Sequence, residues 1–177
     1  LEQCMDLFLG GTISSAKPLI EGYGITLPDT WIEDFYAKVY DVLRDTAEAI
    51  PGIKGALRQI EDAGIPYCVA SNGRVEKMEI TLGRTGLLDQ FKDVMFSAQT
   101  LENPKPAPDL FLAAASAFGI SPDNCVVIED SKTGVLAAKR AGMKCFGYAP
   151  HGNSAALEAE DAIPFDDMAQ LPALLGL

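Results

Sequence analysis

The sequence predicts an α/β protein in which a parallel sheet is flanked by helices and preceded by a small all-helical unit. Short apolar runs alternate with helix-like segments from about residue 53 to the end of the chain. Four of these helix-like segments end at a glycine, as helices commonly do: Gly64, Gly86, Gly119 and Gly142. Strands that alternate with helices in this way are typical of βαβ units and therefore of a parallel sheet.

The first 48 residues carry only helical patterns. Residues 12–23 have apolar side chains at helix spacing, and Pro18 inside the pattern predicts a kink. Residues 28–30 start a long amphipathic helix. Its predicted apolar side comprises Trp31, Phe35, Val39, Val42 and Leu43. Because residues 49–52 resemble a junction, we expect a helical unit over residues 1–48 and an α/β core over residues 49–177.

The α/β core has a predicted order of elements. Helices are expected at residues 53–63, 75–85, 108–118, 133–141 and 168–175. Strands are expected at residues 66–70, 93–96, 125–128 and 144–148, with a last short strand around residues 162–163. The run 125–128 is apolar throughout, which predicts a strand that is buried on both faces.

Composition and charge exclude several classes of protein. The chain has 177 residues, of which 48% are hydrophobic, and a formal net charge of −11. Such an acidic chain is a poor nucleic-acid binder, because phosphate backbones require clustered Lys and Arg. No run is long enough for a membrane span, and no signal peptide opens the chain. The four cysteines lack a CxxC spacing, which favours reduced, buried thiols in a cytoplasmic protein.

Two adjacent carboxylates follow the strand predicted at residues 125–128. Glu129 and Asp130 would lie at the carboxyl end of a parallel strand, where open α/β sheets place their ligands. Neighbouring carboxylates repel each other and need a positive partner, and Mg²⁺ prefers oxygen ligands of this kind. The alternative is structural, because Asp130-Ser131 before a helix is also an ordinary N-cap sequence.

Two further polar segments are expected at the same edge of the sheet. Ser71-Asn72-Gly73 lies between a predicted strand and a helix, so it could cradle an anion, or it could be a plain turn. Lys105 stands between two prolines that stiffen its backbone, and a fixed cation suits a phosphate group. The alternative for Lys105 is a solvated side chain in a Pro-rich loop. Together the three segments indicate magnesium-assisted handling of a phosphate group.

The order of these motifs resembles the haloacid dehalogenase superfamily, in particular its phosphatases and phosphoglucomutases with a helical cap. The likeness covers nearly the whole chain, and it implies a partial cap at residues 1–48 and a Rossmann-like core at residues 49–177. By this resemblance the phosphate would be held by Ser71, Asn72, Gly73 and Lys105, with Ser71 and Lys105 also catalytic. The resemblance further implies that Mg²⁺ would be carried by Glu129 and Asp130, in a loop shaped by Ser131 and Gly134.

One departure from the family pattern matters most. The family's nucleophile is the first Asp of an Asp-x-Asp-Gly-Thr motif, and this sequence has none. Residues 7–12 resemble that motif superficially, but Phe8 and Gly10 occupy both Asp positions, so we interpret them as cap sequence. In the family, the missing strand lies between the strands that end here at Ser71 and Glu129. We therefore expect that an N-terminal piece is lacking, and that these two strands pair directly or are covered by an intermolecular contact.

The sequence thus predicts a magnesium-dependent phosphatase that acts on small phosphate monoesters and is inactive as this chain alone. The expected partner is a small phosphorylated metabolite, and self-association through exposed sheet edges is also expected. Two alternatives stay open, a non-catalytic relic that binds phosphate or metal, and a sugar-phosphate mutase. The cap loop at residues 9–14 has no basic residue for a second phosphate, which favours the phosphatase. Arg74 and Lys77 are either substrate contacts or solvated charges.

Overall fold

A computed structural model of the protein describes residues 13–177, so the likeness at residues 7–12 and most of the 9–14 loop lie outside the described part. The helices are α2 (Ile13–Glu21), α3 (Trp31–Thr46), α4 (Ile53–Asp62), α5 (Val75–Thr85), α6 (Leu88–Phe91), α7 (Asp109–Phe118), α8 (Lys132–Arg140), α9 (Ser154–Glu158) and α10 (Leu171–Leu174). The strands are β1 (Val69–Ser71), β2 (Met95–Ser97), β3 (Val126–Glu129), β4 (Lys144–Tyr148) and β5 (Ile163–Phe165).

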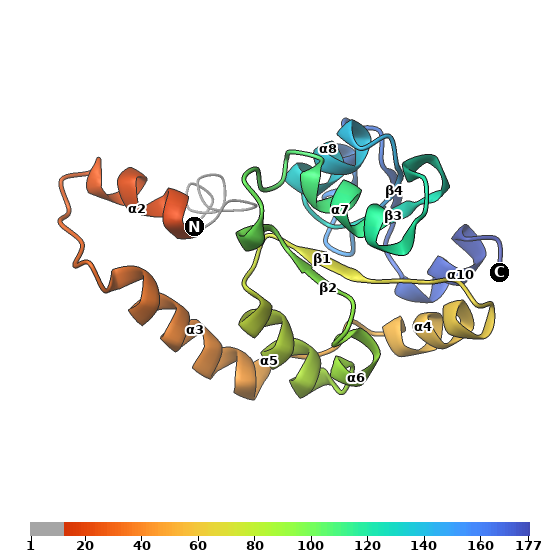
Figure 1. Cartoon of the computed structure of the whole chain (residues 1–177), viewed down its shortest axis with the longest axis horizontal. Coiled ribbons are helices and arrows are strands. Elements are labelled where there is room, and N and C mark those ends of the chain that lie inside the picture. Colours follow the sequence, from red (N-terminus) through yellow and green to blue (C-terminus); the bar gives the residue numbers. More distant parts are fainter. Residues whose placement is uncertain (1–12) are drawn as a thin grey trace.

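All strand pairs are parallel, as the alternation of strands and helices predicts. β1 pairs with β2 in a two-stranded sheet, and Ser71 lies opposite Ser97 in this register. β3, β4 and β5 form a separate three-stranded sheet with β4 in the middle. The proline of this second sheet, Pro164, sits in the edge strand β5, where a missing N–H donor is tolerated. The fold class expected from the sequence, parallel sheets flanked by helices, is confirmed (Figure 1).

Two expectations about β3 meet the structure differently. Of the two outcomes expected for the edges of β1 and β3, direct pairing does not occur, because the strands belong to two separate sheets, while coverage by an intermolecular contact stays a prediction. β3 is also not buried on both faces: Val127 is 6% exposed, whereas Val126 and Ile128 are 42% and 37% exposed. Successive side chains of a strand point to opposite faces. The face that carries Val126 and Ile128 borders a cavity rather than a packed layer, which explains the exposure.

Helix α8 and its neighbours bury the other face of the three-stranded sheet. Val135, Ala137 and Ala138 of α8 are fully buried in one cluster with Val127 and Cys145. Small alanine side chains allow the helix to lie close to β3 and β4. A second cluster unites α4, β4, β5 and the C-terminal helical turns; it comprises Ala56, Ile60, Phe146, Phe165, Met168 and Leu171.

Helices α2 and α3 extend from one side of the α/β part as an arm (Figure 1). The predicted long helix is present, and its predicted apolar side is half-buried at Trp31, Phe35, Val39 and Leu43 but exposed at Val42. Tyr36 and Tyr40 are buried, at 9% and 3% exposed, whereas Val42 is 58% exposed. The difference arises because α3 packs against α5 of the core. Its most buried side is therefore shifted by that partner from the predicted stripe toward Tyr36 and Tyr40.

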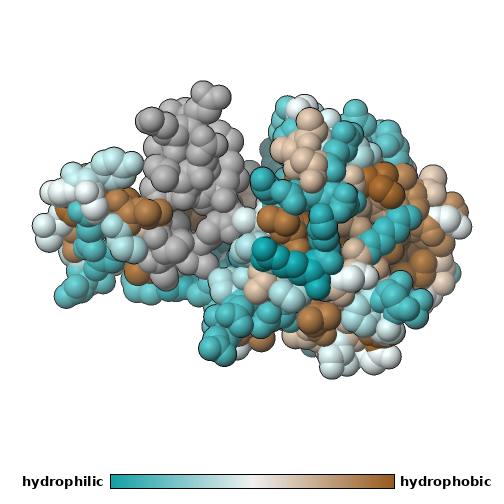
Figure 2. All heavy atoms as spheres, turned by 90° about the horizontal axis from the view of Figure 1, so that it is seen from above, coloured by the Kyte–Doolittle hydropathy of each residue, from teal (hydrophilic) through white to brown (hydrophobic). Residues whose placement is uncertain are grey.

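The bounds of several elements agree closely with the sequence pattern. The helix at residues 75–85 and the strand at residues 144–148 have the predicted ends. The predicted C-terminal helix is divided into a 3₁₀ turn, Met168–Gln170, and the short α10. No helix within residues 13–177 is long and apolar enough to span a membrane. The space-filling view in Figure 2 shows apolar side chains at several places on the surface of the α/β part.

Candidate functional site

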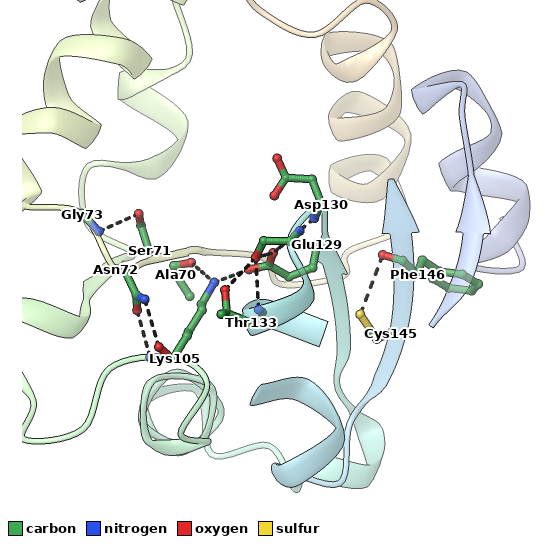
Figure 3. Close-up of polar contacts among 12 residues, drawn as sticks. Ala70, Ser71, Asn72, Gly73, Lys105, Glu129, Asp130, Thr133, Cys145 and Phe146 are labelled. Carbon is green, nitrogen blue, oxygen red and sulfur yellow. Dashed lines mark hydrogen bonds and ion pairs between the residues drawn. The ribbon is translucent and has the colours of Figure 1, made fainter. Parts of the chain in front are cut away.

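The three polar segments singled out in the sequence meet at one edge of the molecule. Ser71 is the last residue of β1, and Glu129 is the last residue of β3. Figure 3 shows Ser71, Asn72 and Lys105 gathered on one side of Glu129 and Asp130. The parallel strands bring these residues together because the carboxyl ends of such strands lie at the same edge. The chemical roles assigned to the residues stay predictions.

The loop after β1 forms a compact turn that is fixed by β2. The Ser71 hydroxyl accepts a hydrogen bond from the Gly73 N–H at 3.0 Å. Ser97 Oγ donates to the Gly73 carbonyl at 2.7 Å, and Gln99 Nε2 donates to the Asn72 carbonyl at 2.9 Å. Ser97 is 5% exposed. Sequence reasoning missed this residue, although its place at the end of a short apolar strand could have signalled it.

Lys105 is buried and held at several points. Its side chain is 8% exposed, which excludes the alternative of a solvated lysine. The ammonium group donates to the Ala70 carbonyl at 3.0 Å and forms an ion pair with Glu129 (Figure 3). It also lies 4.6 Å from the centre of the Phe111 ring. The next residue is tied down as well, since Arg140 donates to the Pro106 carbonyl at 2.8 Å.

Glu129 is surrounded by donors. Besides Lys105, its carboxylate accepts hydrogen bonds from the Ser131 hydroxyl at 2.9 Å and from the main-chain N–H groups of Asp130 and Ser131 at 3.2 Å each. A Cβ atom at Gly134 would overlap this carboxylate. Only glycine at position 134 therefore leaves space for the Glu129 side chain, and this close approach was not predicted from the sequence.

Ser131 combines the two alternatives that the sequence left open. Its hydroxyl contacts Glu129 and also accepts the Gly134 N–H at 3.1 Å, which makes Ser131 the N-cap of α8. The N-cap interpretation of this segment is thus confirmed for Ser131. It does not remove the carboxylate pair, because Glu129 and Asp130 still lie side by side at the strand end.

The carboxylate oxygens of Glu129 and Asp130 are ligands of the kind that a hard divalent cation prefers. The Asp130 residue is exposed to solvent as a whole, but its carboxyl group is partly desolvated. This desolvation and the neighbouring Glu129 raise the pKa of Asp130. Such crowding of negative charge is relieved by a cation. Mg²⁺ typically binds to one or two carboxylates, together with waters and phosphate oxygens. Within residues 13–177 no cluster of three or more His, Cys, Asp or Glu side chains could hold a metal, and the role of this pair as metal ligands stays a prediction.

An apolar cavity of about 530 Å³ lies between the two sheets. One wall comes from the β1 segment, including Cys68 and Ala70, and the opposite wall comes from Val126 and Ile128 of β3. Phe111 of α7 also lines it. The facing edges of β1 and β3 carry no strand partner within residues 13–177. The cavity therefore lies where a further strand could pair with both edges.

Arg74 connects the loop after β1 to α3. Its guanidinium donates two hydrogen bonds to the Glu33 carboxylate at 2.6 and 2.7 Å, and it stacks 3.9 Å from the centre of the Tyr36 ring. These hydrogen bonds lower the pKa of Glu33. Arg74 is thus not simply a solvated charge, and in this structure it faces the helical arm. Nearby, the Tyr40 hydroxyl is buried without a hydrogen-bond partner among the described residues.

The fold and site define an α/β protein with a carboxylate pair and a buried lysine at the sheet edge. The family model of the haloacid dehalogenase-like hydrolases matches residues 7–142. The chain therefore belongs to the haloacid dehalogenase-like hydrolases. This match confirms the family that we expected from the Ser71-Asn72-Gly73 segment, Lys105 and the Glu129-Asp130 pair.

Individual relatives point the same way. The chain is 32% identical over 153 residues to 6-phosphogluconate phosphatase of Escherichia coli strain K12, covering 86% of this chain and 68% of that protein. A haloacid dehalogenase-like protein of unknown function from Agrobacterium tumefaciens matches with a TM-score of 0.81 at 28% identity, covering 99% and 82%. A putative beta-phosphoglucomutase from Thermotoga maritima matches with a TM-score of 0.76 at 26% identity, covering 99% and 83%. The chain spans 58% or less of three further curated relatives.

Proposed function

We propose that this chain forms most of the helical cap and most of the core of a magnesium-dependent phosphatase that acts on small phosphate monoesters. The observation that carries the proposal is the shared location of the Ser71 loop, Lys105 and the Glu129-Asp130 pair. A loop at a helix start, a buried cation and a carboxylate pair together provide what phosphoryl transfer requires, namely positioning and charge neutralisation. Membership in the family and the relation to a phosphatase support the same reaction class.

Each residue has a role in this proposal. The Ser71 hydroxyl and the main-chain N–H groups of its turn bind the phosphate oxygens, and Lys105 neutralises the developing charge. Glu129 and Asp130 hold Mg²⁺, with the exposed Asp130 as the more accessible ligand. When bound, the ion supplies a positive charge that orients the phosphate and lowers the repulsion between it and the carboxylates.

In our proposal, the nucleophile is a carboxylate that lies outside residues 13–177. Attack on phosphorus requires a carboxylate near Lys105, and the sequence contains no Asp-x-Asp motif. The cavity between β1 and β3 supports one occupant, an extended apolar strand that pairs with both edges and ends in an Asp beside Lys105. Without that strand we expect no turnover, and the exposed edges favour self-association of the chain.

The substrate class is a small phosphorylated metabolite, such as a sugar or sugar-acid phosphate. Helices α2 and α3 act as the cap in this proposal, and residues 1–48 and 49–177 form the two parts of the enzyme. A cytoplasmic location agrees with such a substrate and with the free thiols of Cys68, Cys125 and Cys145. The mutase alternative has support in the fold of the Thermotoga protein. It differs by requiring a bisphosphate activator.

The test is phosphate release by a longer protein that includes the coding region upstream of Leu1. We expect a strand-like segment with Asp-x-Asp-Gly there, hydrolysis of 6-phosphogluconate with Mg²⁺, and loss of activity with EDTA. The Asp→Asn variant of that segment is the matched control, because it removes only the nucleophile. A stop codon or unrelated sequence upstream, with no phosphate release, would favour the phosphate- or metal-binding relic. Activity that depends on an added sugar bisphosphate would favour the mutase.

A further inference from the structure

The Asn72 side chain is occupied by the main chain of Lys105, which lies 33 residues further along the chain. Asn72 Oδ1 accepts the Lys105 N–H at 3.0 Å, and Asn72 Nδ2 donates to the Lys105 carbonyl at 3.3 Å (Figure 3). Both polar ends of the carboxamide thus contact one residue. This arrangement differs from the phosphate contact that the motif alone suggests for this side chain.

The local sequence gives these two hydrogen bonds particular weight. Pro104 and Pro106 carry no N–H group, so the Lys105 N–H is the main-chain donor of this tripeptide. Lys105 is buried, and a buried main-chain donor or acceptor without a partner is costly. If the Asn72 carboxamide turned toward a phosphate, it would leave both the N–H and the carbonyl of Lys105 to find new partners.

The two residues on either side of Ser71 hold both ends of Lys105. Asn72 binds the main chain, while the Ala70 carbonyl accepts a hydrogen bond from the ammonium group at 3.0 Å. Asn72 is itself anchored, because Gln99 Nε2 donates to its carbonyl at 2.9 Å. The lysine is therefore fixed relative to the Ser71 hydroxyl by bonds to the same short segment of chain.

We propose that Asn72 is a positioning residue that acts on phosphate binding through Lys105. We call the two hydrogen bonds between Asn72 and the Lys105 main chain the clamp. The clamp joins the loop after β1 and the loop that carries Lys105 into a single rigid unit, so that the ammonium group stays at a fixed place beside Ser71. This inference rests on the proposed function for its benefit to phosphate binding. The clamp itself is independent of catalysis and can be tested without turnover.

The first experiment is a double-mutant cycle on the binding of inorganic phosphate in the presence of Mg²⁺. We expect Asn72→Ala to weaken binding by about tenfold, because the cation is no longer held in place. In a Lys105→Met background the same change should have less than about a twofold effect, since nothing remains to be positioned. A full effect of Asn72→Ala in both backgrounds would overturn the proposal. Asn103→Ala is the matched control, because this exposed amide of the same loop contacts Asp109 rather than Lys105.

The second experiment follows Lys105 itself and needs no phosphate. Trace acetic anhydride, read by mass spectrometry, measures the reactivity of the Lys105 amine relative to the exposed Lys92. We expect Lys105 to be protected in the wild-type chain and to react several-fold faster in Asn72→Ala, with Asn72→Ser in between. Thermal unfolding of each variant verifies that it is folded. Unchanged labelling in folded variants would contradict the clamp, whereas a wild-type chain that binds no phosphate would count only against the proposed function.

Discussion

Two ion pairs connect distant parts of this chain, and they differ in almost every physical respect. Lys105 and Glu129 join the loop before α7 to the end of β3, and their side chains are only 8% and 9% exposed. Arg74 and Glu33 join the core to the arm helix α3, and their side chains are 28% and 68% exposed. Both contacts bring opposite charges within hydrogen-bond reach, so a list of ion pairs alone would treat them as equivalent.

The comparison shows that losing a partner costs more free energy for a buried charge than for an exposed one. A buried charge that loses its partner remains desolvated, whereas an exposed charge is rehydrated by water. Lys105 and Glu129 therefore depend on each other as partners, because either side chain alone would be a buried charge without a counter-charge. Arg74 and Glu33 gain little free energy from their contact, even though it includes two hydrogen bonds and a stacked ring. We expect loss of the buried pair to lower the free energy of unfolding of the whole protein. Loss of the exposed pair should affect only the packing of the arm helix α3.

The largest effect is expected when the buried pair is broken on one side. Glu129→Gln leaves the Lys105 ammonium buried without a counter-charge, and we expect a loss of about 3–5 kcal/mol in the free energy of unfolding, measured in urea. The double variant Glu129→Gln, Lys105→Met should recover a large part of this loss, because it removes both charges. A loss below about 1 kcal/mol in the single variant would mean that water reaches the pair.

A slightly smaller effect is expected from Gly134→Ala. The new methyl group would overlap the Glu129 carboxylate, so the side chain must leave its donors or the start of α8 must shift. We expect a loss of about 2–3 kcal/mol in urea unfolding, together with weaker Mg²⁺ binding by calorimetry. Gly55→Ala is the matched control, because the methyl group added to this glycine of α4 would meet nothing within 4 Å apart from its chain neighbours and the adjacent backbone of its own helix.

The control variant should move stability in the opposite direction. Alanine is favoured over glycine inside a helix, so Gly55→Ala is expected to stabilise the protein by about 0.5–1 kcal/mol. Equal losses in both glycine variants would show that Gly134 is needed for the helix itself and not for Glu129.

The exposed pair should contribute much less. Glu33→Gln removes the partner of Arg74 but leaves it hydrated, so we expect the melting temperature to fall by about 1 °C or less. The change should instead appear as faster hydrogen exchange in the peptide that covers α3, and it should be largest at low salt. Asp45→Asn, an acid of the same helix whose side chain forms none of the ion pairs found within residues 13–177, serves as control.

The smallest effect is expected for a fully surface pair. Lys92 and Asp89 lie 3.3 Å apart, and their side chains are 56% and 98% exposed. Asp89→Asn should leave the melting temperature unchanged within experimental error at physiological salt. A loss as large as that of Glu33→Gln would remove the distinction between the arm contact and an ordinary surface pair.

Much of the fold followed from periodicity. The ends of the helix at residues 75–85 and of the strand at residues 144–148 were predictable, because Gly86 follows the helix and Gly142 and Pro150 flank the strand. The meeting of Ser71, Lys105 and Glu129 was also predictable, because parallel strands share one carboxyl edge. The element ends depend on local sequence, and the meeting of the three residues depends on the general topology of parallel sheets. Both can be inferred without knowing the tertiary contacts.

Other features depended on contacts that no local pattern encodes. The buried side of α3 is set by its packing on α5, so Tyr36 and Tyr40 are buried in place of the predicted Val42. The contact of Asn72 with the Lys105 main chain joins residues 33 positions apart. The exposure of Val126 arises from the cavity between the two sheets. Contacts between residues far apart in the sequence determine each of these features, and the periodicity of the sequence does not reveal such contacts.

The position of Trp31 has a practical consequence. It is the only tryptophan in the sequence and stands at the first residue of α3, where its ring lies 5.8 Å from that of Phe35. It is two residues from Glu33, and it belongs to the arm rather than to the α/β part. Tryptophan fluorescence, excited beyond the absorption band of the tyrosines, is therefore a label-free optical signal from the arm alone. It can be recorded on the millisecond scale while ligands are mixed with the core.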